Sequence, residues 1–297
     1  MPISRSRSLL LSSLTTVALL VAGCTDADEP ADTADEPATG DAPAIVSLSP
    51  TTTEMLYAVG AGEQVVAVDE RSNYPEEAPV TELSGYTPNL EAILGYDPDL
   101  VVATDDNDEI VAGLERAGVE VLLLPAGQTL DDTYTQLEQV GAATGREDEA
   151  TEVVSEMSSE IDEIVASLPE REEPLTYFHE LDDTYFTVTD DTYIGHVYSL
   201  LGLTSIATGD DDYPQLSGEV ILEEDPDFVF LSDAQCCGVT PESVADRAGW
   251  DELTAVREGN VHVVDEDLAS RWGPRVVDFM REVAEILSNA PAEEPAS

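Results

Sequence analysis

The chain has 297 residues, enough for two ordinary domains, and 42% of them are hydrophobic, which supports a substantial core. Its formal net charge is −53, with 64 acidic residues against 11 cationic ones, all of them arginine. This balance excludes a nucleic-acid-binding protein, which needs a basic face for phosphate contacts.

The acidity also indicates the medium in which the chain folds. Many like charges repel one another at low salt, whereas at about 1 M salt the screening length falls to roughly 3 Å. The composition therefore favours a halophile-type surface. An acidic protein from a mesophile with a GC-rich genome remains the alternative.

Residues 1–23 have the pattern of a secretory signal. Arg5 and Arg7 precede an apolar run over residues 9–22, which is too short to span a membrane and suits the core of a signal peptide. Small residues then lead to Cys24, and this ending resembles a lipoprotein signal, in which the cysteine is acylated and becomes the new N-terminus. A plain secretory signal with an incidental cysteine is the alternative.

Both ends of the mature chain are predicted to lack a fold. Residues 24–43 are rich in Asp, Glu, Pro and Thr and have almost no large apolar side chains. Such a segment cannot bury enough surface to offset its ordering entropy, so we expect a disordered acidic tether. We also expect residues 291–297 to form a disordered tail.

Strand and helix patterns alternate over residues 44–146, which predicts an N-terminal α/β lobe with a mostly parallel sheet. The predicted strands are 44–49, 64–69, 99–104 and 119–126, and the predicted helices are 51–61, 89–97 and 107–118.

Residues 147–169 are predicted to be a connecting helix. Apolar residues from Ala150 to Leu168 recur at helical spacing in one continuous stripe. At 1.5 Å per residue such a helix is roughly 33 Å long. Pro169 and the charged run behind it end the helix.

The α/β pattern then restarts over residues 170–290, which predicts a C-terminal lobe of similar order. We therefore expect two Rossmann-like α/β lobes, joined by one long rigid helix, with a ligand cleft between them. The predicted strands are 175–181, 184–189, 227–232 and 260–265, and the predicted helices are 195–203, 218–225, 241–249 and 274–289.

One phrase occurs in both lobes. The stretch "NLEAILGYDPDLVVA" at residues 89–103 returns as "SGEVILEEDPDFVFL" at residues 217–231, shifted by 128 positions, with seven of 15 residues identical. Asp-Pro-Asp before a strand is common punctuation in α/β proteins, but the matched order on both sides favours a duplicated unit.

Together with "IVSLSPTTTEMLYAVGAGEQVVAVD", "NYPEEA" and "ASRWGPRVVDF", the duplicated phrase resembles the helical-backbone (class III) substrate-binding proteins of ABC importers, over residues 44–289. That family serves vitamin B12, ferric siderophores and haem. The resemblance implies a lipid-anchored extracytoplasmic binding protein with no catalytic residues and no cofactor of its own. Its partners would be an ABC permease dimer with its ATPase, and its cargo a chelate of iron or cobalt.

In this family a glutamate on each lobe docks onto arginines of the permease. The matching positions are Glu91 and Glu219, because each holds the third place of the duplicated phrase. Charge-assisted bonds to arginine suit such docking. Solvated surface glutamates on an acidic protein are the alternative.

The resemblance also implies cleft residues. Asp267 and Arg271 have the Asp-x-x-x-Arg spacing of vitamin B12-binding members, which favours a corrinoid. Arg71 stands where those members tend to have an aromatic residue, which favours an anionic siderophore, and Tyr86 lies one residue closer to the docking glutamate than their tryptophan. Both ligand classes stay open, with haem as another. Further cleft candidates are Trp272, His179, Tyr185 and Tyr213.

The remaining cysteines and the histidines bear on metals. Cys236 and Cys237 are adjacent, so outside the cell they can close into a vicinal disulfide, although reduced thiols or a metal site are alternatives. The three histidines lie in separate segments, which does not favour a metal site. An enzyme lacks support because no nucleophile elbow or phosphate-binding glycine loop is present. A sensor lipoprotein without a permease is a further alternative.

Overall fold

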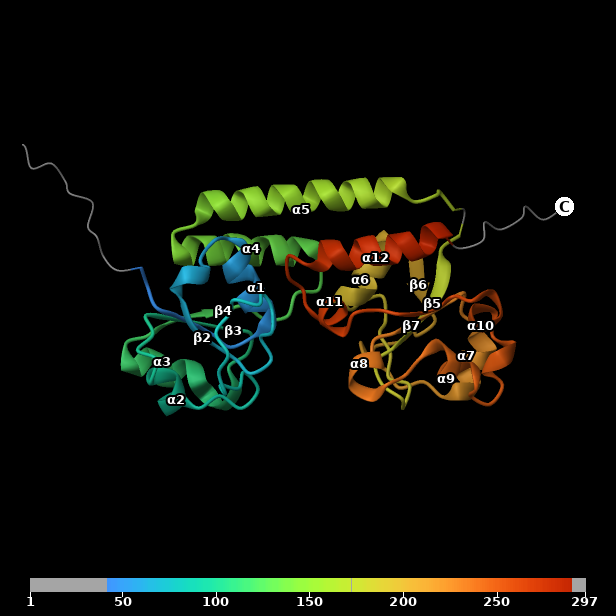
Figure 1. The fold of residues 1–297 in the computed structure, drawn as a ribbon, viewed down its shortest axis with the longest axis horizontal. Helices are drawn as coiled ribbons and strands as arrows, with labels where there is room; N and C mark the ends of the chain where they lie inside the picture. Colours follow the sequence, from blue (N-terminus) through green and yellow to red (C-terminus); the bar gives the residue numbers. More distant parts are fainter. Residues whose placement is uncertain (1–41, 172, 290–297) are drawn as a thin grey trace, which may run out of the picture. The chain divides into compact units, whose positions relative to one another are not determined.

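The computed structural model describes residues 42–171 and 173–289, and the figures show this part of the chain in colour (Figure 1). The predicted signal peptide, Cys24, all but two residues of the predicted tether and the predicted tail lie outside the described residues. Among the described helices, none is both long and apolar enough to cross a membrane.

The N-terminal lobe is built on a four-stranded parallel sheet with strand order β2-β1-β3-β4. Buried residues on one face pack against α1 and α4, and those on the other face pack against α2 and α3. The elements are β1 (Ile45–Ser47), α1 (Pro50–Ala58), β2 (Val65–Val68), α2 (Leu90–Leu94), β3 (Leu100–Ala103), α3 (Ile110–Ala117), β4 (Glu120–Leu123) and α4 (Leu130–Thr144).

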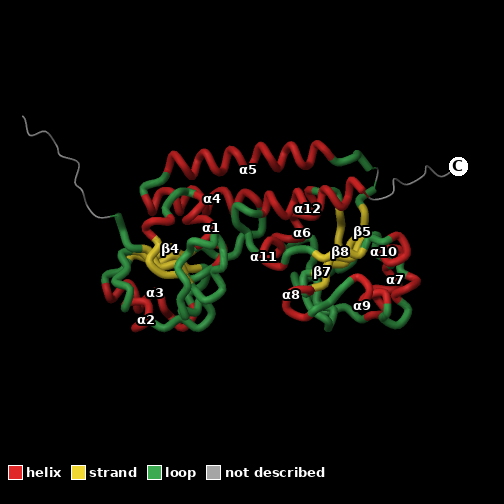
Figure 2. The backbone as a smooth tube through the Cα atoms, in the orientation of Figure 1, coloured by secondary structure: helices red, strands yellow, loops and turns green. Residues whose placement is uncertain are grey.

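The C-terminal lobe repeats this plan with a four-stranded parallel sheet of order β6-β5-β7-β8. Here α6 and α12 cover one face, while the short helices α7, α9 and α10 lie at the other (Figure 2). The elements are β5 (Leu175–Glu180), α6 (Tyr193–Leu200), β6 (Leu203–Ser205), α7 (Gly218–Glu224), β7 (Phe228–Leu231), α8 (Ala234–Cys237), α9 (Pro241–Ala245), α10 (Thr254–Glu258), β8 (Val261–Val263), α11 (Glu266–Ser270) and α12 (Val276–Asn289).

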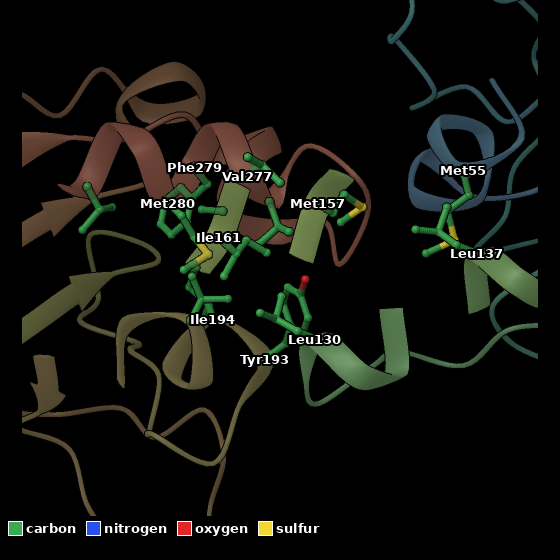
Figure 3. Close-up of a cluster of buried hydrophobic side chains, with 14 of the residues drawn as sticks. Met55, Leu130, Leu137, Met157, Ile161, Tyr193, Ile194, Val277, Phe279 and Met280 are labelled. Atoms are coloured by element: carbon green, nitrogen blue, oxygen red, sulfur yellow. The ribbon is translucent and has the colours of Figure 1, made fainter. Parts of the chain in front are cut away.

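The long helix α5 (Glu147–Ser167) joins the lobes and packs along α4 and α12 (Figure 1). Its buried face presents Ala150, Met157 and Ile161. These side chains belong to one hydrophobic cluster that runs from Met55 on α1 to Met280 on α12 (Figure 3). Because this cluster crosses from one lobe to the other, the lobes share a core as well as a covalent connection.

One expectation from the sequence needs correction, and one helix was not predicted. Residues 184–189 do not form a strand of the sheet. This segment is a loop that extends beyond the end of β5. Within it, Phe186 makes an isolated bridge to Gln215. The helix α4 was not expected, although Thr129 and Asp132 form a capping box at its start.

The duplicated phrase forms the same unit in both lobes. Asn89 caps α2 and Ser217 caps α7, and each side chain accepts the N–H three residues on. The second aspartate of each Asp-Pro-Asp accepts a bond from the central strand's entrance. Asp99 Oδ2 lies 2.8 Å from the Ala44 N–H, and Asp227 Oδ2 lies 2.7 Å from the Thr176 N–H. The repeat is therefore a strand-anchoring device as well as a pseudo-symmetric surface.

Candidate ligand-binding cleft

Two adjoining cavities lie between the lobes, where loops leave the carboxyl ends of the parallel strands. Open α/β sheets place ligands at this edge. The cavities have volumes of about 230 and 460 Å³ and share Glu266, Ser270 and Trp272 in their walls. A third cavity, of about 540 Å³, is lined by the C-terminal lobe alone around His262 and the end of α12, so it is not part of this cleft.

The smaller cavity, here called the aromatic cavity, is mostly apolar. Leu181, Val188, Ile194 and Ala269 supply aliphatic surface, and Gly127 closes it from the N-terminal lobe. Its remaining walls are Ala126, His179, Tyr193, Tyr213, Ser232, Glu266, Ser270 and Trp272.

His179 contributes a neutral ring to this cavity. It is 1% exposed, and its Nδ1 lies 2.9 Å from the Tyr198 hydroxyl. Burial lowers the pKa of His179 to about 4 because the charged imidazolium would lose its hydration. The site therefore offers no cation at His179 near neutral pH.

The larger cavity, here called the polar cavity, is lined by both lobes. The N-terminal lobe gives the start of α1, from Ser49 to Thr51, together with Glu70, Arg71 and Asn73. The C-terminal lobe gives Glu266, Asp267, Ser270, Arg271 and Trp272. Three carboxylates and two guanidinium groups therefore face one another across it.

The charge at Arg271 is already neutralised. Its Nη1 lies 2.6 Å from Glu54 Oε1, and its Nη2 lies 2.6 Å from Asp267 Oδ1. Arg275 Nε binds the second oxygen of Glu54 at 3.1 Å. Because the Glu54 side chain is 1% exposed and that of Arg271 is 7% exposed, these charges interact with little screening by water.

Residues 267–275, here called the bridging segment, are also held to the N-terminal lobe by neutral contacts. Thr133 Oγ1 donates to the Trp272 carbonyl at 3.0 Å, and Trp272 Nε1 donates to Gln136 Oε1 at 3.0 Å. Asn73 Nδ2 donates to Asp267 Oδ2 at 2.7 Å. Trp272 thus stands as a fixed partition between the two cavities.

The structure brings most of the predicted cleft residues together. Arg71, Asp267, Arg271 and Trp272 line the polar cavity, and His179 and Tyr213 line the aromatic cavity with Trp272. Two of the predicted cleft residues lie outside both cavities. Tyr86 is 84% exposed on a loop outside both cavities. Tyr185 stacks on Trp250 at 5.5 Å, where Arg247 covers its ring.

Three residues that hold the bridging segment were not predicted from the sequence: Glu54, Gln136 and Thr133. Glu54 lies within "TTTEML", and its hydrophobic neighbours face the core. A charged residue inside an apolar helix face was the available signal, since such a residue is almost never buried without a partner.

Comparisons with known proteins support the same reading of the fold. The sequence pattern of the periplasmic binding protein family matches residues 45–268. This chain belongs to the periplasmic binding protein family.

Relatives of this periplasmic binding protein carry informative names. An uncharacterized ABC transporter substrate-binding lipoprotein, YvrC of Bacillus subtilis, is 31% identical over 82% of this chain and 79% of its own. A cobalamin-binding protein of Halobacterium salinarum is 31% identical over 82% of this chain and 69% of its own. The crystal structure of the vitamin B12-binding protein BtuF of Vibrio cholerae superimposes with a TM-score of 0.69 at 29% identity, over 83% of this chain and 97% of that one.

The second buried ion pair of this binding protein lies inside its C-terminal lobe. Glu180, at the end of β5, binds Arg247 through both oxygens, at 2.5 and 2.6 Å. For the fully buried Asp233 carboxylate, the described part of the chain offers neither oxygen a hydrogen-bond partner of good geometry. Burial, and then the neighbouring Glu180 charge, raise the pKa of Asp233 to about 6.

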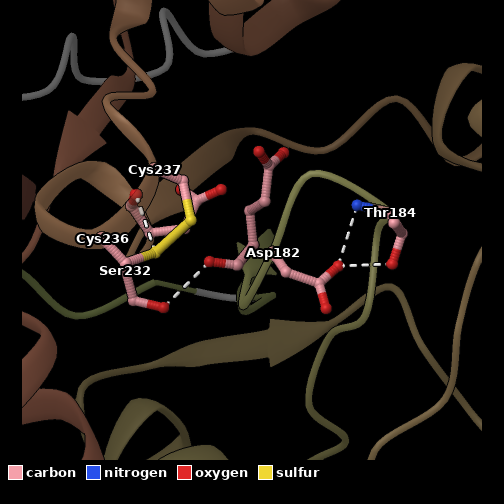
Figure 4. The surroundings of a disulfide bond; sticks show 7 residues. Asp182, Thr184, Ser232, Cys236 and Cys237 are labelled. Carbon is pink, nitrogen blue, oxygen red and sulfur yellow. Dashed lines mark hydrogen bonds between the residues drawn. A yellow bond between two sulfur atoms is a disulfide. The ribbon is translucent and has the colours of Figure 1, made fainter.

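The structure joins Cys236 and Cys237 in a disulfide on the exposed α8, one turn beyond Asp233 (Figure 4). Cys236 Sγ contacts the Asp233 carbonyl at 3.4 Å, and Ser232 Oγ donates to the Glu180 carbonyl at 2.9 Å. The disulfide therefore begins four residues beyond Ser232, which is a wall residue of the aromatic cavity. No cluster of three or more His, Cys, Asp or Glu side chains suited to a metal occurs in the described chain.

The predicted docking glutamates occupy equivalent places on the two lobes. Glu91 lies in the first turn of α2 and Glu219 in the first turn of α7, and both are exposed. In each helix the buried isoleucine two positions on, Ile93 or Ile221, fixes the helix against its sheet. Each carboxylate is therefore presented to solvent from an anchored helix.

Proposed function

We propose that this binding protein captures a corrinoid outside the cell and delivers it to an ABC permease. Acylation of Cys24 would anchor the chain to the membrane, and the tether would let the folded part reach the permease. The observation that carries the ligand assignment is the state of Arg271, whose guanidinium is occupied by Glu54 and Asp267.

An anionic chelate would find little positive charge in the cleft. Arg271 and Arg275 are bound to carboxylates, while Glu70, Glu266 and Asp267 face the polar cavity. Arg71 is the cleft arginine for which the described residues offer no ion pair or side-chain hydrogen bond. A corrinoid carries mainly neutral amide groups around an apolar macrocycle, so it requires hydrogen-bonding groups and flat apolar surface more than positive charge.

The aromatic cavity supplies that apolar surface. Trp272, Tyr213 and the neutral His179 ring border it, and aromatic faces suit contact with a flat macrocycle. The relatives from Halobacterium salinarum and Vibrio cholerae point the same way, since the first is described as a cobalamin-binding protein and the second as a vitamin B12-binding protein. A role as an enzyme has no support from these relatives, which are binding proteins.

The test is a titration of the purified protein in high salt with cobalamin, ferric hydroxamate and catecholate siderophores, and haem. We expect cobalamin to bind with a dissociation constant of about 1 μM or tighter and W272A to weaken binding by about 10-fold or more. Y86A is the matched control, because Tyr86 lies outside both cavities. Calorimetry is the readout, because these ligands absorb light and distort tryptophan fluorescence.

The outcomes separate the ligands. Binding of siderophores without cobalamin would overturn the corrinoid assignment and point to Arg71 as an anion contact. Binding of haem alone would overturn it in favour of a porphyrin. Binding of none of them would overturn the chelate proposal itself.

A further inference from the structure

We propose that Glu54 is a positioning residue that latches the bridging segment of the C-terminal lobe onto the N-terminal lobe and thereby sets the shape of the ligand cleft. The latch follows from contacts in the protein alone. Its effect on ligand binding rests on the function proposed above.

Glu54 is bound by the opposite lobe. It lies on α1 of the N-terminal lobe, and its two oxygens bind Arg271 and Arg275, both more than 200 residues further along the chain. In the described residues, no hydrogen bond from its own lobe reaches either oxygen. A buried carboxylate needs compensation, so its position is stable only while the two arginines stay in place.

The latch lies apart from the connection that α5 makes. Figure 1 shows α11, whose last four residues begin the bridging segment, between the two sheets and apart from the long helix. The lobes are thus joined along α5 and again at Glu54. Two separated attachments resist relative rotation of the lobes better than one.

The latch is connected to the cleft through Trp272. Trp272 follows Arg271 directly and forms part of the wall of both cavities. With Arg271 held by Glu54 and Asp267, the backbone at Trp272 cannot shift without breaking short charge-assisted bonds. Arg275 is further held over the Tyr74 ring at 4.1 Å. Glu54 therefore fixes the partition between the cavities without touching the ligand.

The chain's acidity makes a buried latch useful. At the salt concentrations that screen a surface of net charge −53, exposed pairs such as Arg281–Glu160 lose most of their attraction. The Glu54 pair keeps its attraction because little water or salt reaches it. The lobes can then stay joined over a wide range of salt.

The test is E54Q, studied by hydrogen exchange of the bridging-segment amides in the ligand-free protein. We expect exchange there to speed up by about 10-fold or more, because loss of the charge weakens both arginine contacts. E180Q is the matched buried control, since it breaks an arginine pair within one lobe. E160Q is the exposed control, since it removes a surface pair of α5 with α12.

A double variant separates positioning from general destabilisation. If Glu54 acts through Arg271, E54Q/R271Q should exchange no faster than the more affected single variant, within about 2-fold. R275Q provides a milder version for the case in which E54Q does not fold, with an expected increase of about 3-fold. Exchange in the bridging segment that matches E180Q and E160Q would overturn the latch.

Ligand binding then tests the consequence. We expect E54Q to weaken cobalamin binding by about 10-fold through faster dissociation, while E160Q leaves it unchanged. Faster exchange with unchanged affinity would overturn the effect on the cleft but keep the latch. Failure of the natural protein to bind any chelate would overturn the proposed function, and the exchange result would still decide the latch.

Discussion

At the scale of single residues, the buried ionisable groups are of two kinds. Some are paired with an opposite charge, and others are held in their neutral form. Glu54 and Glu180 are fully buried and each binds arginine through both oxygens. His179 and Asp233 are also buried, but among the described residues neither forms an ion pair with an opposite charge. Burial therefore favours their neutral forms, which lowers the pKa of His179 and raises that of Asp233.

The His179 shift predicts a pH dependence of stability. Its pKa of about 4 in the folded state lies below the ordinary value of 6.5, so the unfolded state binds more protons between these pH values. The contribution is complete above pH 6.5 and is lost as the pH falls toward 4, on the order of 3 kcal/mol in total. H179Q should lack this component when urea unfolding is measured across that range.

The contribution of Asp233 to stability changes with pH in the opposite direction to that of His179, so the two contributions must be measured separately. Its raised pKa of about 6 means that the folded state binds the extra proton, so its contribution is present at low pH and is lost as the pH rises through 6. The substitution D233N, made in the natural protein and in H179Q, removes the contribution of Asp233. If D233N and the double variant H179Q/D233N lose stability in parallel between pH 6.5 and 4, the assignment to His179 is wrong.

At the scale of elements, the repeated phrase has two structural roles. Its glutamate faces solvent, while its second aspartate holds the entrance of the central strand. The first aspartate, Asp97 or Asp225, has a positive φ of 52° or 42°, which turns the chain from helix toward strand. The proline that follows cannot continue the helix.

The two anchoring aspartates should differ in energetic weight. Asp227 accepts bonds from both the N–H and the hydroxyl of Thr176, whereas Asp99 accepts one from the Ala44 N–H. We expect D227A to lower the free energy of unfolding by about 2 kcal/mol and D99A by about 1 kcal/mol. Urea unfolding of the two variants gives the comparison, and a larger loss in D99A would contradict the assigned roles.

The elements show what the sequence could and could not specify. The long helix α5 and the duplicated unit were predictable because their signals are periodic and local. The helix α4 was missed because its apolar residues are sparse, and its capping box has Asp132 where Glu or Gln is the familiar signal. Glu54 carried a local signal, as a charged residue inside an apolar helix face, but the sequence did not indicate its partners, because both arginines lie over 200 residues away.

At the scale of the whole molecule, the two lobes carry equivalent carboxylates and share one hydrophobic cluster. Glu91 and Glu219 occupy matching first turns, and α5 and the shared hydrophobic cluster join the lobes that present them. A two-fold permease dimer would offer one arginine surface to each lobe. A fixed separation between the two carboxylates would let both contacts form without reorganisation, which lowers the entropy cost of docking.

Docking through these residues makes a prediction for transport. E91R and E219R should each lower uptake of labelled cobalamin by about 10-fold or more in cells that carry the variant as their sole copy, because each places like charges against the permease arginines. The dissociation constant of the purified variants for cobalamin should not change, since neither residue lines a cavity.

The controls for this prediction are E115R and E224R, which reverse exposed glutamates on α3 and α7 and alter the net charge equally. If docking is specific, uptake in these controls stays near that of the natural protein, because a distributed acidic surface tolerates one reversal at high salt. An equal loss of uptake in all four variants would show that overall charge, and not the repeated glutamates, governs the encounter. A loss confined to E91R and E219R would assign the third position of the duplicated phrase to permease recognition.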